Sequence, residues 1–220
     1  MLMPVEDVVD VSVAGHTCAL RRSGTVVCWG SDVYGQMGLG RRSDAHALVE
    51  VAGVRDAVRV ETGRFHTVAV TRDGHLYSWG YESIHSGSEG RSRRGRYLRP
   101  ALVPGFDDVV DAAADEQFTC VIPRNGAVRC LGAGADAWCE SSCEHTPGTI
   151  PGTTGLLSLT CGSSRQCCGL ASSGAIACWG FLVATPLARG VISTTVETDT
   201  RWSLLRATEG GPTARPEGGR

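Results

Sequence analysis

A set of landmarks recurs four times along the 220-residue chain and constrains its fold more than any other feature. Each copy contains a short apolar stretch, a glycine and a closing pair of residues at fixed spacing. The stretches begin at His16, His66, Phe118 and Gln166; the glycines are Gly24, Gly74, Gly126 and Gly174; the closing pairs are Trp29–Gly30, Trp79–Gly80, Leu131–Gly132 and Trp179–Gly180. The copies follow one another at intervals of 50, 52 and 48 residues. Such regular spacing indicates a repeat architecture.

The spacing inside each copy predicts a β-hairpin. In the first copy the positions 18/28, 20/26 and 21/25 are symmetric about residue 23, which leaves a three-residue loop at 22–24. A type I turn followed by a left-handed residue favours glycine at the last position of such a loop. We expect the same turn at the loops that end at Gly74, Gly126 and Gly174.

Short Val-rich segments precede the hairpins and shorter segments with Pro or Val follow them, so each copy supplies about four strands. Four-stranded antiparallel units at this interval are typical of β-propeller blades. We therefore predict an all-β fold in a single repeat domain over residues 5–210. The blades are expected at about 5–54, 55–106, 107–155 and 156–190, with a partial fifth at 191–210 and a disordered tail at 211–220. The predicted ring is therefore incomplete or open.

These landmarks resemble the repeats of the regulator of chromosome condensation family. Repeats of that family carry a Gly-x-x-His stretch, a turn glycine, a Trp–Gly pair and a Gly-Gln-Leu-Gly loop. The first copy has His16 and the loop Gly35-Gln36-Met37-Gly38, and the second has Gly63 and His66. The second copy has Ser86-Gly87-Ser88-Glu89-Gly90 in place of the loop, the third lacks both His and Trp, and the fourth lacks the His. We expect the shared His, Trp and Gly residues to have structural roles.

The resemblance implies a β-propeller, which normally closes with seven blades in the family, and a non-catalytic module that binds a protein partner. The partner itself is not identified. Two alternatives remain open: guanine-nucleotide exchange, although no projecting β-wedge is identifiable, and a secreted binding or inhibitory propeller similar to the propeller-type β-lactamase inhibitor. Hairpins with a Cys in both strands resemble bacterial, often exported members of the family. Because the ring is short of blades, we expect either missing sequence, head-to-tail self-association or a poorly folded fragment.

Six of the ten cysteines occupy equivalent hairpin positions, as the pairs Cys18/Cys28, Cys120/Cys130 and Cys168/Cys178. The second copy has Val68 and Ser78 there, so both cysteines are missing together, as a bonded pair predicts. If the pair 21/25 is hydrogen-bonded, the pair 18/28 is not, and its Cα atoms lie ~4.5 Å apart. That separation suits a disulfide. Buried free thiols are the alternative.

The remaining cysteines lie outside the hairpin pairs. Cys139 and Cys143 favour a local disulfide, with a zinc site that includes His145 as the weaker alternative. Cys161 and Cys167 are symmetric about residue 164 and are expected to bridge adjacent strands. Disulfides favour an extracytoplasmic or secreted location, whereas the first seven residues lack the basic and apolar segments of a signal peptide. Either the start lies upstream, or the protein is cytoplasmic with reduced cysteines.

One segment stands out by its charge. Five arginines fall within nine residues, and they are Arg91, Arg93, Arg94, Arg96 and Arg99. Such a cluster in a loop between blades two and three could bind an acidic protein surface or phosphate groups. A solvated loop without a partner is the alternative.

Composition and motifs exclude several classes of protein. The 21 basic residues, all Arg, are balanced by 23 acidic residues, so we expect no nucleic-acid partner held by bulk positive charge. No apolar run approaches the ~20 residues of a membrane span. No phosphate-binding, nucleophile-elbow or zinc-protease motif is present. We therefore predict no catalytic residues, no cofactor and no enzyme activity, and we expect Asp115 and Glu116 to be solvated or turn-forming.

Overall fold

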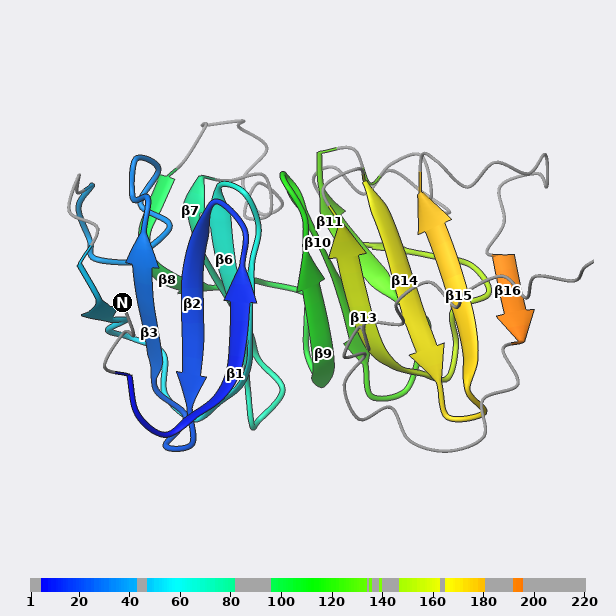
Figure 1. Ribbon diagram of the computed structural model, residues 1–220. Helices are drawn as coiled ribbons and strands as arrows, with labels where there is room; N and C mark the ends of the chain where they lie inside the picture. The colour runs from blue at the N-terminus through cyan, green and yellow to red at the C-terminus, as the bar shows by residue number, and fades with distance from the viewer. Residues whose placement is uncertain are drawn as a thin grey trace, which may run out of the picture.

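The computed structural model describes residues 5–42, 47–81, 96–133, 135, 139, 147–162, 165–180 and 192–195. Within these residues the chain forms four antiparallel sheets of four strands each and no helix (Figure 1). The prediction of an all-β fold with four four-stranded blades is therefore confirmed. No helix of the described part is long and apolar enough to cross a membrane.

The strands follow the chain order within each blade. Blade 1 contains β1 (Val8–Val13), β2 (His16–Arg21), β3 (Val26–Gly30) and β4 (Val49–Glu50). Blade 2 contains β5 (Ala57–Thr62), β6 (His66–Thr71), β7 (Leu76–Tyr81) and β8 (Arg96–Leu102). Blade 3 contains β9 (Val109–Ala114), β10 (Phe118–Pro123), β11 (Arg129–Gly132) and β12 (Gly148–Thr149). Blade 4 contains β13 (Leu156–Gly162), β14 (Gln166–Ala171), β15 (Ala175–Gly180) and β16 (Ile192–Thr195).

The last strand corrects one boundary of the sequence analysis. Residues 192–195 were assigned to a partial fifth blade, but β16 pairs antiparallel with β15 and completes blade 4. A blade needs a fourth strand to cover its outer edge, and the segment after the fourth hairpin supplies it. The rest of the expected fifth blade and the tail at 211–220 lie outside the described residues.

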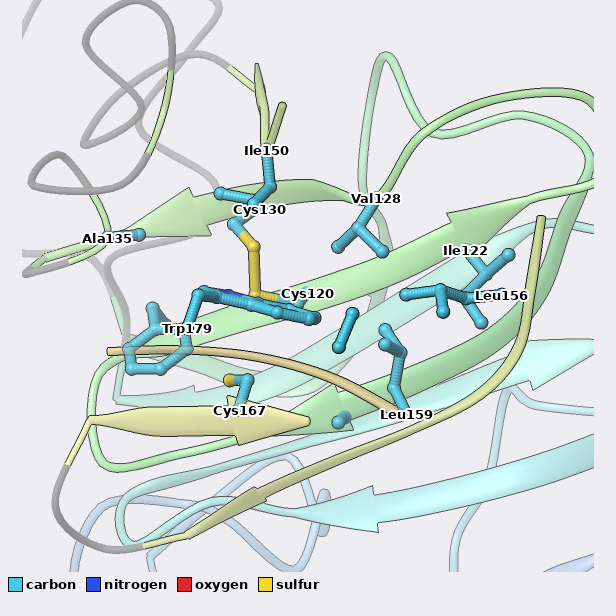
Figure 2. Close-up of a cluster of buried hydrophobic side chains, with 13 residues drawn as sticks. Cys120, Ile122, Val128, Cys130, Ala135, Ile150, Leu156, Leu159, Cys167 and Trp179 are labelled. Atoms are coloured by element: carbon cyan, nitrogen blue, oxygen red, sulfur yellow. A yellow bond between two sulfur atoms is a disulfide. The ribbon is translucent and has the colours of Figure 1, made fainter. Parts of the chain in front are cut away.

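Consecutive blades pack face to face through three apolar clusters. Leu20 and Val26 of blade 1 meet Trp79 of blade 2, and Val68 of blade 2 meets Val121 of blade 3. The contact of blades 3 and 4 joins Cys120, Cys130, Cys167 and Trp179 in a third cluster (Figure 2). Strand alternation explains this arrangement, because successive residues of a blade face its two neighbours in turn.

The hairpin register is the predicted one in blade 1, with Cys18 opposite Cys28 and Leu20 opposite Val26. The turn glycines Gly24, Gly74 and Gly174 have φ of 81°, 84° and 84°, as the loop requires. The turn prediction is wrong at Gly126, which does not adopt a left-handed φ. The reason is Pro123, which stands where Arg21 donates its N–H to Thr25 O in blade 1. Proline has no N–H, so this turn cannot close in the same way.

The glycine of each closing pair is required by a close backbone approach. Gly80 lies opposite His66 with φ 106°, and a Cβ there would stand 2.5 Å from Phe65 O and 2.8 Å from His66 Cα. Gly30, Gly132 and Gly180 also have positive φ at this position. At Gly80, Gly132 and Gly180 a Cβ would stand less than 3.0 Å from backbone atoms, so no other residue type fits there without moving the neighbouring strand.

The cysteine pairs lie at bonding distance. The Cα atoms are 4.1 Å apart in Cys18–Cys28, Cys120–Cys130, Cys168–Cys178 and Cys161–Cys167. Cys139 is also disulfide-bonded, so it does not offer a free thiolate to the zinc site considered with Cys143 and His145, both of which lie outside the described residues.

Candidate binding surface around the inner strands

Each of the four inner strands, β1, β5, β9 and β13, contains a β-bulge at the same position. The extra residues are Val9, Val58, Val110 and Leu157, and they are 49%, 40%, 38% and 60% exposed. A bulge changes the direction of a side chain that alternation would otherwise bury. Because the inner strands of consecutive blades contact one another, the four aliphatic side chains follow each other from blade to blade.

Exposed charged residues precede these bulges in the sequence, again at equivalent positions. Asp7, Asp56 and Asp108 precede the inner strands with φ between 53° and 58°, and each accepts a backbone bond from the first residue of a hairpin loop. Those donors are the backbone N–H groups of Arg22, Arg72 and Arg124. We call Val9, Val58, Val110, Leu157 and these three Asp and three Arg residues the bulge face. An apolar centre with a polar rim is the usual arrangement of a protein interface.

One residue beyond the bulges, a chain of charges connects the inner strands. Asp10, Arg59, Asp111 and Ser158 occupy the same register position in the four blades. The Arg59 guanidinium lies 3.3 Å from Asp10, 2.9 Å from Glu61 and 3.1 Å from Asp111. Asp111 also accepts the backbone N–H of Leu159 at 2.7 Å, so polar contacts run through all four blades.

Burial and the neighbouring charges have opposite effects on the pKa values of these charged residues. Burial raises the pKa of Glu61 to about 7, although Arg59 favours its ionised form. Burial likewise raises the pKa of Asp111. Burial disfavours the charged form of Arg59, but Asp111, Glu61 and Asp10 together raise its pKa above the ordinary value. The contacts therefore hold Arg59 as a cation among three carboxyl groups.

The far ends of the inner strands line a cavity of about 730 Å³. Its polar lining includes Ser12, Arg59, Glu61 and Asp115. We expected Asp115 to be solvated or turn-forming; it lies in the turn between β9 and β10, but it is buried rather than solvated and accepts the backbone N–H groups of Glu116 and Arg165. Burial raises the pKa of this carboxyl group. Through the bond from Arg165, this carboxyl group connects blade 3 to blade 4, which is a structural role.

His16 and His66 form hydrogen bonds between neighbouring blades. His16 Nε2 lies 2.6 Å from Thr67 Oγ1, and His66 Nε2 lies 2.9 Å from Thr119 Oγ1. Thr67 donates its hydroxyl proton to Gln36 O at 2.7 Å, and therefore His16 Nε2 must be the donor to Thr67. Burial and the nearby His66 lower the pKa of His16 to about 3. Its neutral ring is thus a structural group.

The loop after the first Trp–Gly pair reaches the next blade. Gln36 O accepts the indole N–H of Trp79 at 2.8 Å as well as the Thr67 hydroxyl. Gln36 and Met37 are fully buried. The loop residues that resemble the family pattern are therefore part of the contact between blades 1 and 2.

The arginine cluster is only partly described. Arg96 and Arg99 belong to β8, the outer strand of blade 2, so the cluster is not confined to a connecting loop as we had expected. Arg99 is exposed. Arg91, Arg93 and Arg94 lie outside the described residues.

Sequence reasoning missed both the bulges and the Arg59 chain. Its signal was present but weak: the dipeptides Val8-Val9, Val109-Val110 and Leu156-Leu157 break strict alternation at one position of the repeat. Two adjacent aliphatic residues cannot both face the core of a regular strand.

Comparisons with known proteins support the repeat assignment. The profile described as "Regulator of chromosome condensation (RCC1) repeat" matches residues 9–36 and 57–83. These two segments of the chain match the RCC1 repeat. The two matches cover the first hairpin regions of blades 1 and 2, where the His, turn Gly and Trp–Gly residues are all present.

Relatives with RCC1 repeats share moderate sequence identity. The human E3 ubiquitin-protein ligase HERC2 is 27% identical over 74% of the chain, which corresponds to 4% of HERC2. The zebrafish protein RCC2 homolog is 28% identical over 58% of the chain and 26% of its own length. The chain thus spans only a small part of these curated relatives.

Solved structures share the fold. Human WBSCR16 superposes with a TM-score of 0.64 at 21% identity, over 81% of this chain and 50% of its own. Prp20p from Saccharomyces cerevisiae superposes with a TM-score of 0.61 at 21% identity, over 79% and 45%. The blades of this chain therefore share the fold of these two structures.

Proposed function

We propose that this chain is a non-catalytic protein-binding module that engages its partner through the bulge face. The observation that carries the proposal is the fourfold bulge, which places an aliphatic side chain in solvent at the same position of every inner strand. Single exposed aliphatic residues are common on proteins, but exposed aliphatic residues at one position of four neighbouring strands are typical of an interaction site.

The roles of the titratable groups support a non-catalytic module. His16 and His66 are buried in contacts between blades, and Asp115 holds two backbone N–H groups. A general acid or base has to reach a bound substrate. These groups instead have protein partners that fix them.

The proposal predicts which substitutions weaken binding. In Val58→Asp/Val110→Asp, two carboxylates replace the apolar centre of the bulge face, and we expect partner affinity to fall by about tenfold or more. Val33→Asp is the matched control, because Val33 is also exposed, at 53%, but is not part of the bulge face. A photo-reactive side chain at position 58 or 110 identifies the partner by cross-linking, and the purified partner is then titrated against all three proteins.

Two outcomes would contradict this use of the bulge face. One is a partner that binds folded Val58→Asp/Val110→Asp as tightly as the unchanged chain; the other is cross-linking from position 33 and not from 58 or 110. Circular dichroism establishes that each variant is folded.

The first probes follow from the comparisons. Prp20p was described with its binding to Gsp1p and histones, and these two proteins are therefore the first partners to titrate. Guanine-nucleotide exchange is the second candidate, carried by the family resemblance. Nucleotide release from purified small GTPases, with and without the chain, measures it directly, and we expect no acceleration.

We also propose that the chain works in an oxidising compartment, because its cysteine pairs lie at bonding distance. The mass of the protein isolated from its source without reductant tests this, since each disulfide lowers the mass by two hydrogens.

A further inference from the structure

Two cysteine pairs from different blades meet at the contact of blades 3 and 4. Cys120 and Cys130 lie on β10 and β11, whereas Cys161 and Cys167 lie on β13 and β14. The Sγ atoms of Cys120, Cys161 and Cys167 all lie within 4.8 Å of one another, and Cys130 Sγ is 2.02 Å from Cys120 Sγ. Figure 2 shows the Cys120–Cys130 bridge and the Cys167 side chain entering one cluster from the two blades.

We propose that reduction turns these four cysteines, Cys120, Cys130, Cys161 and Cys167, into a tetrahedral site for Zn²⁺. Structural zinc sites with four cysteines have Zn–S bonds of about 2.3 Å, which places the sulfur atoms about 3.8 Å apart. That separation lies between the bonded distances within the pairs, 2.02 and 2.06 Å, and the 4.8 Å limit across the blades. Reduction frees Cys130 from Cys120, and its Sγ, which is not among the three that lie within 4.8 Å of one another, has to move toward Cys161 and Cys167 to complete the site.

The chemistry of the site favours zinc over harder cations. Thiolates are soft ligands that select Zn²⁺ over Mg²⁺ or Ca²⁺. Cys120, Cys130 and Cys167 have no exposed surface, so a bound ion would be shielded from water. The indole N–H of Trp179 lies in the same cluster and has no acceptor among the described residues. A hydrogen-bond donor near a metal thiolate stabilises its negative charge.

The other hairpin pairs lack this arrangement. Cys18 and Cys28 face blade 2, where Thr62 and Thr67 stand in place of Cys161 and Cys167. Cys168 and Cys178 are not part of the blade 3–blade 4 cluster, because alternation turns them to the opposite face of blade 4. Each of these pairs can offer two thiolates, which are too few for a tetrahedral site.

The reaction has two balanced steps. A phosphine reductant transfers two electrons to each disulfide, and water supplies the two protons and leaves its oxygen on the phosphine. Two equivalents of phosphine thus convert two disulfides into four thiols. Zn²⁺ then replaces the four thiol protons, which are released to solvent, so binding strengthens as the pH rises.

The test titrates the full chain with Co²⁺ after reduction with a phosphine and removal of excess reductant under argon. We expect the visible absorption bands of a tetrahedral thiolate complex to saturate at one equivalent, and Zn²⁺ to abolish them. An absence of these bands, or weak bands typical of six-coordinate Co²⁺, would overturn the proposal.

Three double variants assign the site. Cys161→Ser/Cys167→Ser should lose the tetrahedral bands, while Cys18→Ser/Cys28→Ser should keep them, although each variant removes one disulfide-bonded pair. Cys139→Ser/Cys143→Ser should also keep them. Loss of the bands only in the last variant places the metal elsewhere and overturns the assignment.

A measurement on the unchanged chain covers the case in which a variant does not fold. The reduced protein is alkylated with and without Zn²⁺, and the modified cysteines are located by mass spectrometry. We expect Zn²⁺ to protect Cys120, Cys130, Cys161 and Cys167 and to leave Cys18, Cys28, Cys168 and Cys178 reactive. Equal protection of all eight, or of none, contradicts the proposal.

Discussion

The protonation state of His16 affects the contact between blades 1 and 2. Its Nε2–H donates to Thr67, and its Nδ1 is buried without a partner among the described residues. Protonation would place a charge on Nδ1 with no acceptor to receive it, which is costly in a buried site. The lowered pKa of about 3 follows from this geometry.

We therefore predict that His16 makes the fold acid-sensitive. Between pH 6.5 and about 3 the unfolded chain binds a proton on His16 that the folded chain does not, so the free energy of unfolding falls as the pH falls. This one group contributes a slope of up to about 1.4 kcal/mol per pH unit. Urea unfolding of the unchanged chain and of His16→Gln, at several pH values, measures the difference in slope.

The comparison of two proteins removes a competing effect. Glu61, with its pKa raised from 4.5 to about 7, makes the folded chain the stronger proton binder between those values and so opposes His16 there. It is present in both proteins and cancels. His75→Gln, at a half-exposed histidine, is the control. Identical slopes for the unchanged chain and His16→Gln would refute the prediction.

At the scale of the strand and hairpin, equivalent turns differ in what they require. Gly74 has φ 84°, and a Cβ there would stand 2.9 Å from Asp108 Cα, whereas Gly126 has no left-handed φ. We predict that Gly74→Ala lowers the free energy of unfolding by about 1–3 kcal/mol. Gly126→Ala should change it by less than about 1 kcal/mol. Thermal unfolding of both variants checks this, and equal losses would contradict it.

The same pair of turns shows how far sequence could lead. The hairpins, their register and the cysteine pairing were predictable because they depend on contacts between residues about ten apart. Pro123 is evident in the sequence. Its effect on the turn could not be predicted, because the hydrogen bond that it removes, from Arg21 N–H to Thr25 O in blade 1, is known only from the structure. Arg59 contacts Asp10 and Asp111, which lie about 50 residues away on either side. Such distant partners cannot be predicted from the spacing of residues within one repeat.

At the scale of the whole molecule, one sheet face of blade 1 is exposed along its inner strand β1, although Ala19 and Val27 on the same face are buried. Asp10 and Ser12 contact blade 2, so the alternate residues Val11 and Val13 point away from it, and they are 54% and 70% exposed. Trp29 on the same face is half-buried, whereas Trp79 and Trp179, its equivalents, are 0% and 3% exposed. An apolar sheet face of this kind favours association.

We predict that the chain self-associates through this face. Sedimentation velocity at increasing protein concentration should show a dimer or larger species, and Val11→Asp/Val13→Asp should shift it to monomer. Val33→Asp is the control for an exposed valine elsewhere. A monomer at every concentration for the unchanged chain would rule the prediction out.

The row of residues formed by Asp10, Arg59, Asp111 and Ser158 also limits how a repeat protein of this kind can evolve. Its blades look like interchangeable modules, yet each contributes a different residue to one shared position. Exchanging the second and third units would set Asp10 beside Asp111 and remove the cation that separates them. The ion pairs between the blades therefore depend on the order of the four blades. A gene rearrangement that duplicates, deletes or shuffles blades must also change the residues at this position.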